Sequence, residues 1–103
     1  MNAELATVLR RVEALQPGVV AVGHGRDPRS VAQAEAFAEA WPGEIGDVVS
    51  WPAQAASWLR PATRLAAAGD VWVVADATGG WRGMLPRLVE TSWRADRTVV
   101  FLP

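Results

Sequence analysis

Short apolar runs alternate with segments of helical periodicity along the whole chain, and this alternation constrains the fold more than any other feature. Apolar positions recur at helical spacing in segments that we expect to be helices over residues 3–15, 30–41, 53–68 and 83–93. Shorter apolar runs predict strands over residues 18–23, 45–51, 71–75 and 98–102. Strands that are separated by helices form parallel sheets, and helices cover both faces of such sheets.

The pattern therefore predicts a three-layer α/β fold with a four-stranded parallel sheet. Right-handed crossovers leave few strand orders, and we favour the flavodoxin-like order 2-1-3-4. A chain of 103 residues is short enough for a single domain, in which residues 1–16 add an extra helix to a core over residues 18–103. In a sheet of this order, the ligand site lies beyond the carboxyl ends of the first and third strands.

Polar residues and prolines indicate where the helices begin and break. Ser30, with a glutamine three residues later, forms a capping box, which predicts that the second helix opens at Ser30. The alternative is that Asp27 is the N-cap and Pro28 is the first helical residue. Pro61 predicts a kink or break just before it in the third helix, and Pro86 is tolerable only in the first turn of the fourth.

Composition excludes several classes of chemistry. The chain has no cysteine, which removes disulfides and thiolate sites, and no lysine, which removes Schiff-base chemistry. His24 is the only histidine, so zinc sites built from several histidines are excluded. A net charge of −1 argues against nucleic-acid partners. No run approaches the ~18 apolar residues of a membrane span, and the N-terminus has no signal pattern, so we expect no membrane association and a cytoplasmic location.

Polar chemistry concentrates in two predicted loops, the first over residues 23–30 and the second over residues 76–82, at the ends of the first and third predicted strands. The first holds His24 and the second begins with Asp76, and we expect this pair to be the catalytic centre. Helix N-termini and glycine-rich backbone at the same edge favour an anionic ligand. The expected ligand-binding residues are Gly23, Gly25, Arg26, Arg29, Ser30, Thr78, Gly79, Gly80, Trp81 and Arg82.

Structural roles are alternatives for the same residues. His24 lies between two glycines and is equally expected as a turn residue whose ring bonds a backbone carbonyl. Asp76 is equally expected to form an Asx-turn with the loop amides. The arginines of both loops are alternatively solvated surface charges, and Trp81 either covers the core or stacks on a flat ligand.

The run over residues 22–30, VGHGRDPRS, resembles the opening motif of small sirohydrochlorin chelatases. Weaker similarity extends from residue 19 to residue 102, and it includes a Leu85-Pro86 pair after the third strand. Such enzymes insert cobalt, nickel or ferrous iron into a tetrapyrrole. The resemblance implies that His24 takes a pyrrole proton or holds the incoming divalent metal ion. The family's second histidine, after the third strand, has no counterpart where this chain reads Gly80-Trp81-Arg82, although Asp76 offers an oxygen donor.

The run over residues 73–80, VVADATGG, resembles the strand and loop of mannose-type phosphotransferase IIA domains. This resemblance implies a histidine phosphocarrier in which His24 accepts the phosphoryl group and Asp76 orients its ring. A non-catalytic interaction module that kept the fold is the third possibility. Its partner surface would be the N-terminal helix, and the partner would be another protein or a further copy in a homo-oligomer. Tryptophan and arginine, both frequent in this chain, are enriched at interface hot spots.

Overall fold

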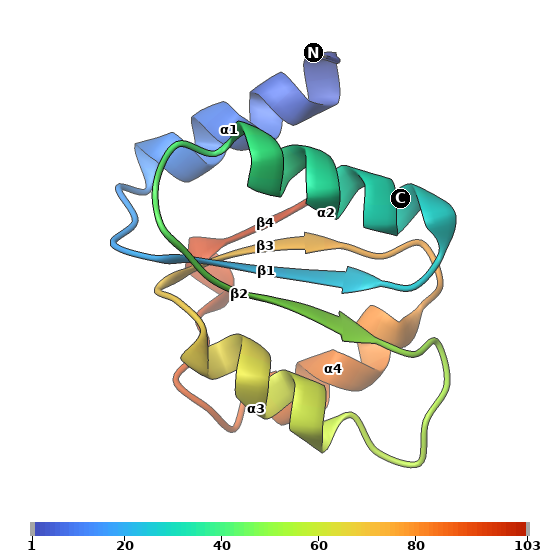
Figure 1. Ribbon diagram of the computed structural model, residues 1–103. Helices are drawn as coiled ribbons and strands as arrows, with labels where there is room; N and C mark the ends of the chain where they lie inside the picture. The colour runs from blue at the N-terminus through green and yellow to red at the C-terminus, as the bar shows by residue number, and fades with distance from the viewer. Residues whose placement is uncertain (1, 103) are drawn as a thin grey trace.

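A parallel sheet lies between two layers of helices in the computed structural model, which describes residues 2–102 (Figure 1). All strand pairs are parallel and the strand order is β2-β1-β3-β4, so the predicted topology is confirmed. The N-terminal helix is also present. Along the chain the elements are α1 (Ala3–Ala14), β1 (Val20–Gly25), α2 (Pro28–Ala40), β2 (Ile45–Trp51), α3 (Leu59–Ala67), β3 (Val71–Ala75), α4 (Gly80–Leu88), the 3-10 turn η1 (Ala95–Arg97) and β4 (Thr98–Val100).

Each face of the sheet has its own apolar core. Helices α1 and α2 cover one face and α3 and α4 cover the other (Figure 1). Successive residues of a strand point to opposite faces, so Val20 and Val22 of β1 pack under α1 and α2, whereas Ala21 packs against the α3 and α4 side. All five residues of β3 are buried, because helices cover this central strand on both sides. Within residues 2–102, no helix is both long and apolar enough to cross a lipid bilayer.

Helix α2 begins at Pro28, so the capping box predicted at Ser30 is wrong and the alternative is confirmed. Asp27 is the N-cap, and its Oδ2 accepts a hydrogen bond of 3.1 Å from the amide of Ser30. Pro28 suits the first position because its missing N–H would have no intrahelical partner. Ser30 is buried, and its Oγ accepts a hydrogen bond of 3.1 Å from the amide of Ala77.

Helix α3 begins at Leu59, which corrects the expected start near residue 53. Residues 52–58 form an irregular loop in which the Trp58 indole N–H donates to the carbonyl of Pro52 over 3.0 Å. Pro61 therefore lies in the first turn of a shorter helix, where a residue needs no amide donor. It does not interrupt a longer helix, contrary to the prediction from the sequence.

Helix α4 begins and ends earlier than expected, at Gly80 and Leu88 instead of residues 83 and 93. Gly79 precedes it with a φ of 92°, a left-handed conformation that glycine adopts without steric cost. Pro86 lies in the second half of α4, so the prediction that it needs the first turn is wrong. The helix ends shortly after the proline. Strand β4 is also shorter than expected, although the amide of Phe101 still donates to the carbonyl of Val74 over 2.8 Å.

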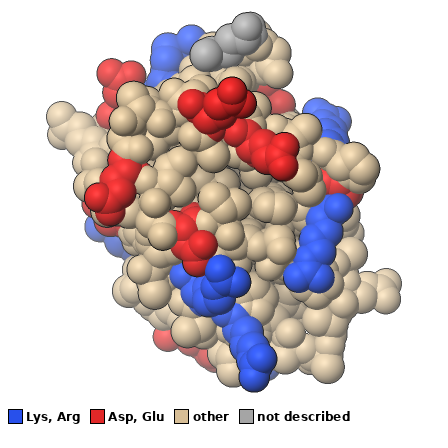
Figure 2. Space-filling view, in the orientation of Figure 1, with Lys and Arg blue, Asp and Glu red and all other residues tan. Residues whose placement is uncertain are grey.

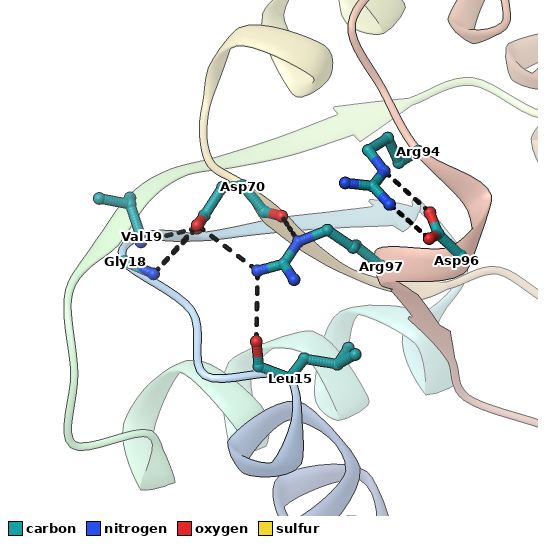
Figure 3. A network of polar contacts seen from close by, with 7 residues as sticks. All are labelled: Leu15, Gly18, Val19, Asp70, Arg94, Asp96 and Arg97. Carbon is teal, nitrogen blue, oxygen red and sulfur yellow. Dashed lines mark hydrogen bonds and ion pairs between the residues drawn. The ribbon is translucent and has the colours of Figure 1, made fainter.

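Asp70 and Arg97 connect the segment before β1 with the start of β3 and with η1, at the amino ends of the strands (Figure 3). Asp70 accepts hydrogen bonds from the amides of Gly18, at 3.1 Å, and Val19, at 2.9 Å. The Arg97 guanidinium donates to the carbonyl of Asp70 at 2.7 Å and to the carbonyl of Leu15 at 3.3 Å. These contacts fix the entry into β1 relative to β3 and η1, at the end of the sheet away from the predicted site.

Candidate functional site

His24 belongs to strand β1 and not to the loop after it, since β1 extends to Gly25. Its neighbours in register are Ser50 of β2 and Ala75 of β3, and its side chain is half-buried. The ring Nδ1 lies 2.6 Å from the carbonyl oxygen of Gly25, so the backbone bond expected in the structural alternative is present, although His24 lies in a strand and not in a turn. A carbonyl oxygen only accepts hydrogen bonds, so the proton of the neutral ring resides on Nδ1. This contact leaves Nε2 with a free lone pair, as the group that can take a proton or bind an electrophile.

The carboxylate of Asp76 accepts four hydrogen bonds from three residues. Its Oδ1 accepts from the amide and the hydroxyl of Thr78, at 2.7 and 2.6 Å. Its Oδ2 accepts from the amide of Trp81 at 2.7 Å and from the indole N–H of Trp51 at 2.8 Å. The Asx-turn that was one alternative for Asp76 is therefore present. The carboxylate has little remaining capacity for a further ligand.

Hydrogen bonding sets the charge state of Asp76. Burial raises the pKa of Asp76, but the hydrogen bonds from Thr78, Trp51 and the Trp81 amide outweigh burial and hold this pKa below its ordinary value of 3.8. Asp76 is therefore ionised at neutral pH and acts as a fixed anion within its own loop.

The ring of His24 and the carboxylate of Asp76 lie on opposite faces of the sheet. Val22 and His24 point to the side of α1 and α2. Gly25 points to the other side, where a Cβ atom would overlap Asp76 and come within 2.9 Å of its Cγ. Among residues 2–102, no hydrogen bond joins the two side chains, because the ring bonds Gly25 and the carboxylate bonds Trp51 and its own loop. The structure thus does not bring together His24 and Asp76 as the pair that we expected to be the catalytic centre.

The second loop is closed by its own contacts. Besides the Trp81 amide on Asp76, the amide of Gly80 donates to the Thr78 hydroxyl at 3.3 Å, and the amide of Arg82 donates to the carbonyl of Gly79 at 3.1 Å. The amides at the start of α4 therefore already have acceptors, and they form no open cradle for an anion. A surface pocket of about 450 Å³ lies beside this loop, lined by Asp76, Ala77, Thr78, Gly79, Trp81 and Arg82.

Trp81 packs against other tryptophans. Its ring centroid lies 5.7 Å from that of Trp51 and 6.1 Å from that of Trp93, the latter in an edge-to-face arrangement. Such contacts are typical of aromatic packing in cores. Because Trp81 also lines the surface pocket, it covers the core with one side and borders the pocket with another.

The first loop is held against the second through Ser30 and Asp27. The Ser30 hydroxyl accepts from the Ala77 amide, which connects the start of α2 to the end of β3. Burial raises the pKa of Asp27, but its hydrogen bonds with the side chain and amide of Ser30 lower it further, so this carboxyl is also ionised. Asp27 and Asp76 thus each serve as a local cap.

Ser50 is a site residue that the sequence analysis missed. The Arg26 Nε donates to Ser50 Oγ over 3.3 Å, and Ser50 is the in-register neighbour of His24. This contact holds the exposed Arg26 side chain at the end of β2, on the residue that lies beside His24 in register. The available signal was the position of Ser50, one residue before the end of a predicted strand that neighbours the first.

Positive charge surrounds this edge of the sheet. Arg26, Arg29 and Arg82 are all exposed. In the view of Figure 2, basic side chains lie along the right-hand side, toward which the strands point, and over α3, whereas acidic side chains gather over the upper helices. The three guanidinium groups outnumber the two ionised carboxylates nearby, Asp27 and Asp76, so the edge has a small excess of positive charge that favours an anion.

A resident divalent metal ion does not fit these residues. In the part of the chain that the structure describes, no group of three or more histidine, cysteine, aspartate or glutamate side chains could hold one. His24 would be a lone nitrogen ligand, and Asp76 keeps its oxygens on amide, hydroxyl and indole donors. Comparison of the chain with family models, curated proteins and solved structures found no match.

Proposed function

We propose that the protein binds an anionic tetrapyrrole at the carboxyl edge of the sheet, with Nε2 of His24 facing the pyrrole nitrogens. The observation that carries this proposal is the 2.6 Å contact between His24 Nδ1 and the Gly25 carbonyl. This contact fixes both the tautomer and the ring orientation, as backbone carbonyls do for functional histidines in general. Nε2 is then a base that accepts one of the two pyrrole protons that a divalent metal ion, as co-substrate, displaces, and the second proton leaves to water.

The charge of the edge supports a ligand with carboxylates. Arg26 directly follows β1, the strand that carries His24, and Arg29 lies in the first turn of α2. A guanidinium pairs with a carboxylate through two parallel hydrogen bonds. Tetrapyrroles carry such carboxylates around a flat ring whose centre presents nitrogen atoms. The run over residues 22–30 also resembles the opening motif of the sirohydrochlorin chelatases. In this proposal the metal ion is only a substrate, which agrees with the absence of a donor cluster among residues 2–102.

The phosphocarrier hypothesis has less support from the geometry. A phosphorylated imidazole needs an orienting group and donors for the phosphate oxygens. Asp76 lies on the other face of the sheet from His24 and does not orient it. The amides of the second loop donate to Asp76, Thr78 and Gly79 and are not free for a phosphate.

Titration with uroporphyrin, a polycarboxylate porphyrin, tests the proposal. The visible absorbance of the porphyrin is followed as protein is added, and the rate of cobalt insertion is then measured with and without protein. We expect saturable binding and faster insertion. His24→Asn keeps an N–H for the Gly25 carbonyl but lacks Nε2, so it should abolish the acceleration.

Two arginine variants show whether binding depends on this edge. Arg26→Gln should weaken uroporphyrin binding by about tenfold, since one charge-assisted pair is lost. Arg10→Gln, which changes an exposed arginine on α1, is the matched control and should bind as the wild type does. An unchanged porphyrin spectrum with folded wild-type protein contradicts the proposal, as does equal weakening by both variants.

A further inference from the structure

Among residues 2–102, strand β4 forms an edge of the sheet, and part of its backbone has no hydrogen-bond partner. The amide of Phe101 donates to Val74, and Val99 is in register with Val73, so these two residues of the chain's last segment turn their backbone groups toward β3. Alternate residues of a parallel strand bond to the same neighbour. The N–H and C=O of Val100 therefore point away from the sheet, and the Val100 side chain is 40% exposed.

The opposite edge of the sheet is protected. In β2, the Asp47 Oδ1 accepts a hydrogen bond of 2.8 Å from the Val48 amide, and Asp47 Oδ2 pairs with Arg64 at 2.8 Å. Charged side chains on an edge strand oppose pairing with another strand. Val48 is 43% exposed, close to the value of Val100. The two edges therefore differ in the charged side chains that oppose strand pairing, and not in the exposure of these valines.

A groove of about 310 Å³ runs along the open edge, between α1 and β4. One side of α1 lines this groove at helical spacing, and β4 and the residues after it line the rest. The lining residues are Ala3, Glu4, Thr7, Val8 and Arg11 of α1, together with Val100 and Leu102. Leu102 is 72% exposed. An apolar groove next to unpaired backbone is a typical site for an added strand.

Helix α1 runs antiparallel to β4, and this alignment orders the charges along the groove. Glu4 Oε2 accepts from the Leu102 amide at 3.0 Å, and the carbonyl of Leu15 accepts from Arg97 at 3.3 Å. Residues 4–15 of a helix and residues 97–102 of a strand both span roughly 16 Å. Glu4 thus lies beside one end of the edge strand, and Arg11 lies toward the other.

We propose that a second copy of this chain docks on the groove, with its β4 antiparallel to the first β4 and a twofold axis at Val100. The two Val100 residues would exchange N–H to C=O hydrogen bonds, which an antiparallel pair of this register makes. The axis is perpendicular to the joined sheet, so the two α1 helices lie on the same face. Glu4 of each copy then faces Arg11 of the other.

Charge complementarity selects a second copy as the occupant. The acidic and basic ends of the groove are self-complementary only when the partner carries the same groove in the opposite direction. Among residues 2–102, no ion pair engages Arg11. In a single copy, Glu4 accepts hydrogen bonds from the Leu102 amide at Oε2 and from the Gln33 side-chain amide at Oε1. In the pair, the Leu102 amide donates to the Thr98 carbonyl of the other copy, which leaves Oε2 of Glu4 for Arg11 of the other copy.

Sedimentation velocity over a dilution series of the full chain tests the pairing. We expect a reversible monomer–dimer equilibrium. Val100→Pro removes only an outward-facing N–H, and proline is tolerated at such edge positions, so the fold should persist by circular dichroism. The dimer Kd should rise about tenfold or more. Val48→Pro, at the equally exposed position of the other edge, is the control. It removes an amide that bonds the Asp47 side chain, so its fold is also checked by circular dichroism, and it should leave the Kd unchanged.

A charge exchange tests the register. Arg11→Glu alone places like charges together and should weaken the dimer, whereas Glu4→Arg combined with Arg11→Glu should restore it. A chain that is monomeric at every concentration overturns the proposal. A dimer that is equally strong in folded Val100→Pro, or a double variant as weak as the single one, overturns it as well. Neither result depends on tetrapyrrole binding, so the two proposals are tested separately.

Discussion

The indole N–H of Trp51 lies 2.8 Å from Oδ2 of Asp76, although 25 residues separate the two along the chain. Trp51 ends β2 and Asp76 follows β3, so the bond passes over the end of β1, which lies between them in the sheet. It can form because Gly25 has no side chain at that point. The carboxylate thereby holds together the edge of the sheet that carries His24.

Asp76→Asn should destabilise the protein by about 2 kcal/mol. An amide side chain has a single acceptor oxygen and presents an N–H₂ group to some of the donors that now face the carboxylate, which leaves them unpaired. Urea unfolding at neutral pH measures the change. Asp96→Asn is the matched control, because Asp96 forms an exposed ion pair with Arg94 and its loss should not measurably change the free energy of unfolding. Equal stability of Asp76→Asn and wild type would contradict this role.

The strands were predictable because apolar runs of their length and spacing have few other interpretations. The run over residues 71–75 is a strand with the predicted bounds, and β1 differs mainly in continuing through His24 and Gly25. The errors lie where local signals compete. Asp27 and Ser30 are both good caps, and the proline after Asp27 decides between them. Residues 52–58 have a helical composition, but the Trp58 bond to Pro52 holds them as a loop.

Acid should destabilise the protein through Asp76. Burial raises the pKa of Asp76, but the hydrogen bonds lower it by more than burial raises it. The pKa of Asp76 is therefore lower in the folded than in the unfolded chain. A depressed folded pKa contributes stability that is complete above the ordinary value of 3.8 and is lost as the pH falls through the folded pKa. The amides of Val19 and Gly18 lower the pKa of Asp70 in the same direction.

Urea unfolding at a series of acidic pH values measures this effect. The free energy of unfolding of the wild type should fall more steeply below about pH 4 than that of Asp76→Asn, since the variant has no carboxyl to protonate at this position. Parallel curves for the two proteins would show that Asp76 does not contribute to the acid sensitivity.

Gly25→Ala should cost about 1–3 kcal/mol, the usual range for an added carbon without space. The new Cβ would overlap the Asp76 carboxylate, which four donors hold in place. Gly18→Ala is the control, because its Cβ would find its nearest atom at 3.5 Å, an ordinary contact with Asp70. Thermal or urea unfolding gives both values. A Gly25→Ala protein as stable as Gly18→Ala would mean that the carboxylate moves without cost.

The edge of the sheet at which His24 and Asp76 lie was predictable from the sequence, but the faces on which their side chains lie were not. Topology alone brings the ends of β1 and β3 to one edge, and the structure does place His24 and Asp76 there. Which face each side chain takes depends on where β1 ends, and β1 ends at Gly25, beyond the predicted strand. Ser50 escaped notice because its contact with Arg26 depends on the register of β2 against β1.

The central claim is that Nε2 of His24 is free to face a bound tetrapyrrole. It is tested most directly by finding which nitrogen of the His24 ring carries the proton. His24 is the only histidine in the chain, so nitrogen NMR of the ring reports on it alone. At a pH where the ring is neutral, the account predicts a proton on Nδ1, bonded to the Gly25 carbonyl, and an unprotonated Nε2 whose resonance shifts when uroporphyrin is added. A ring protonated on Nε2, or an Nε2 signal that saturating uroporphyrin leaves unmoved, would contradict it.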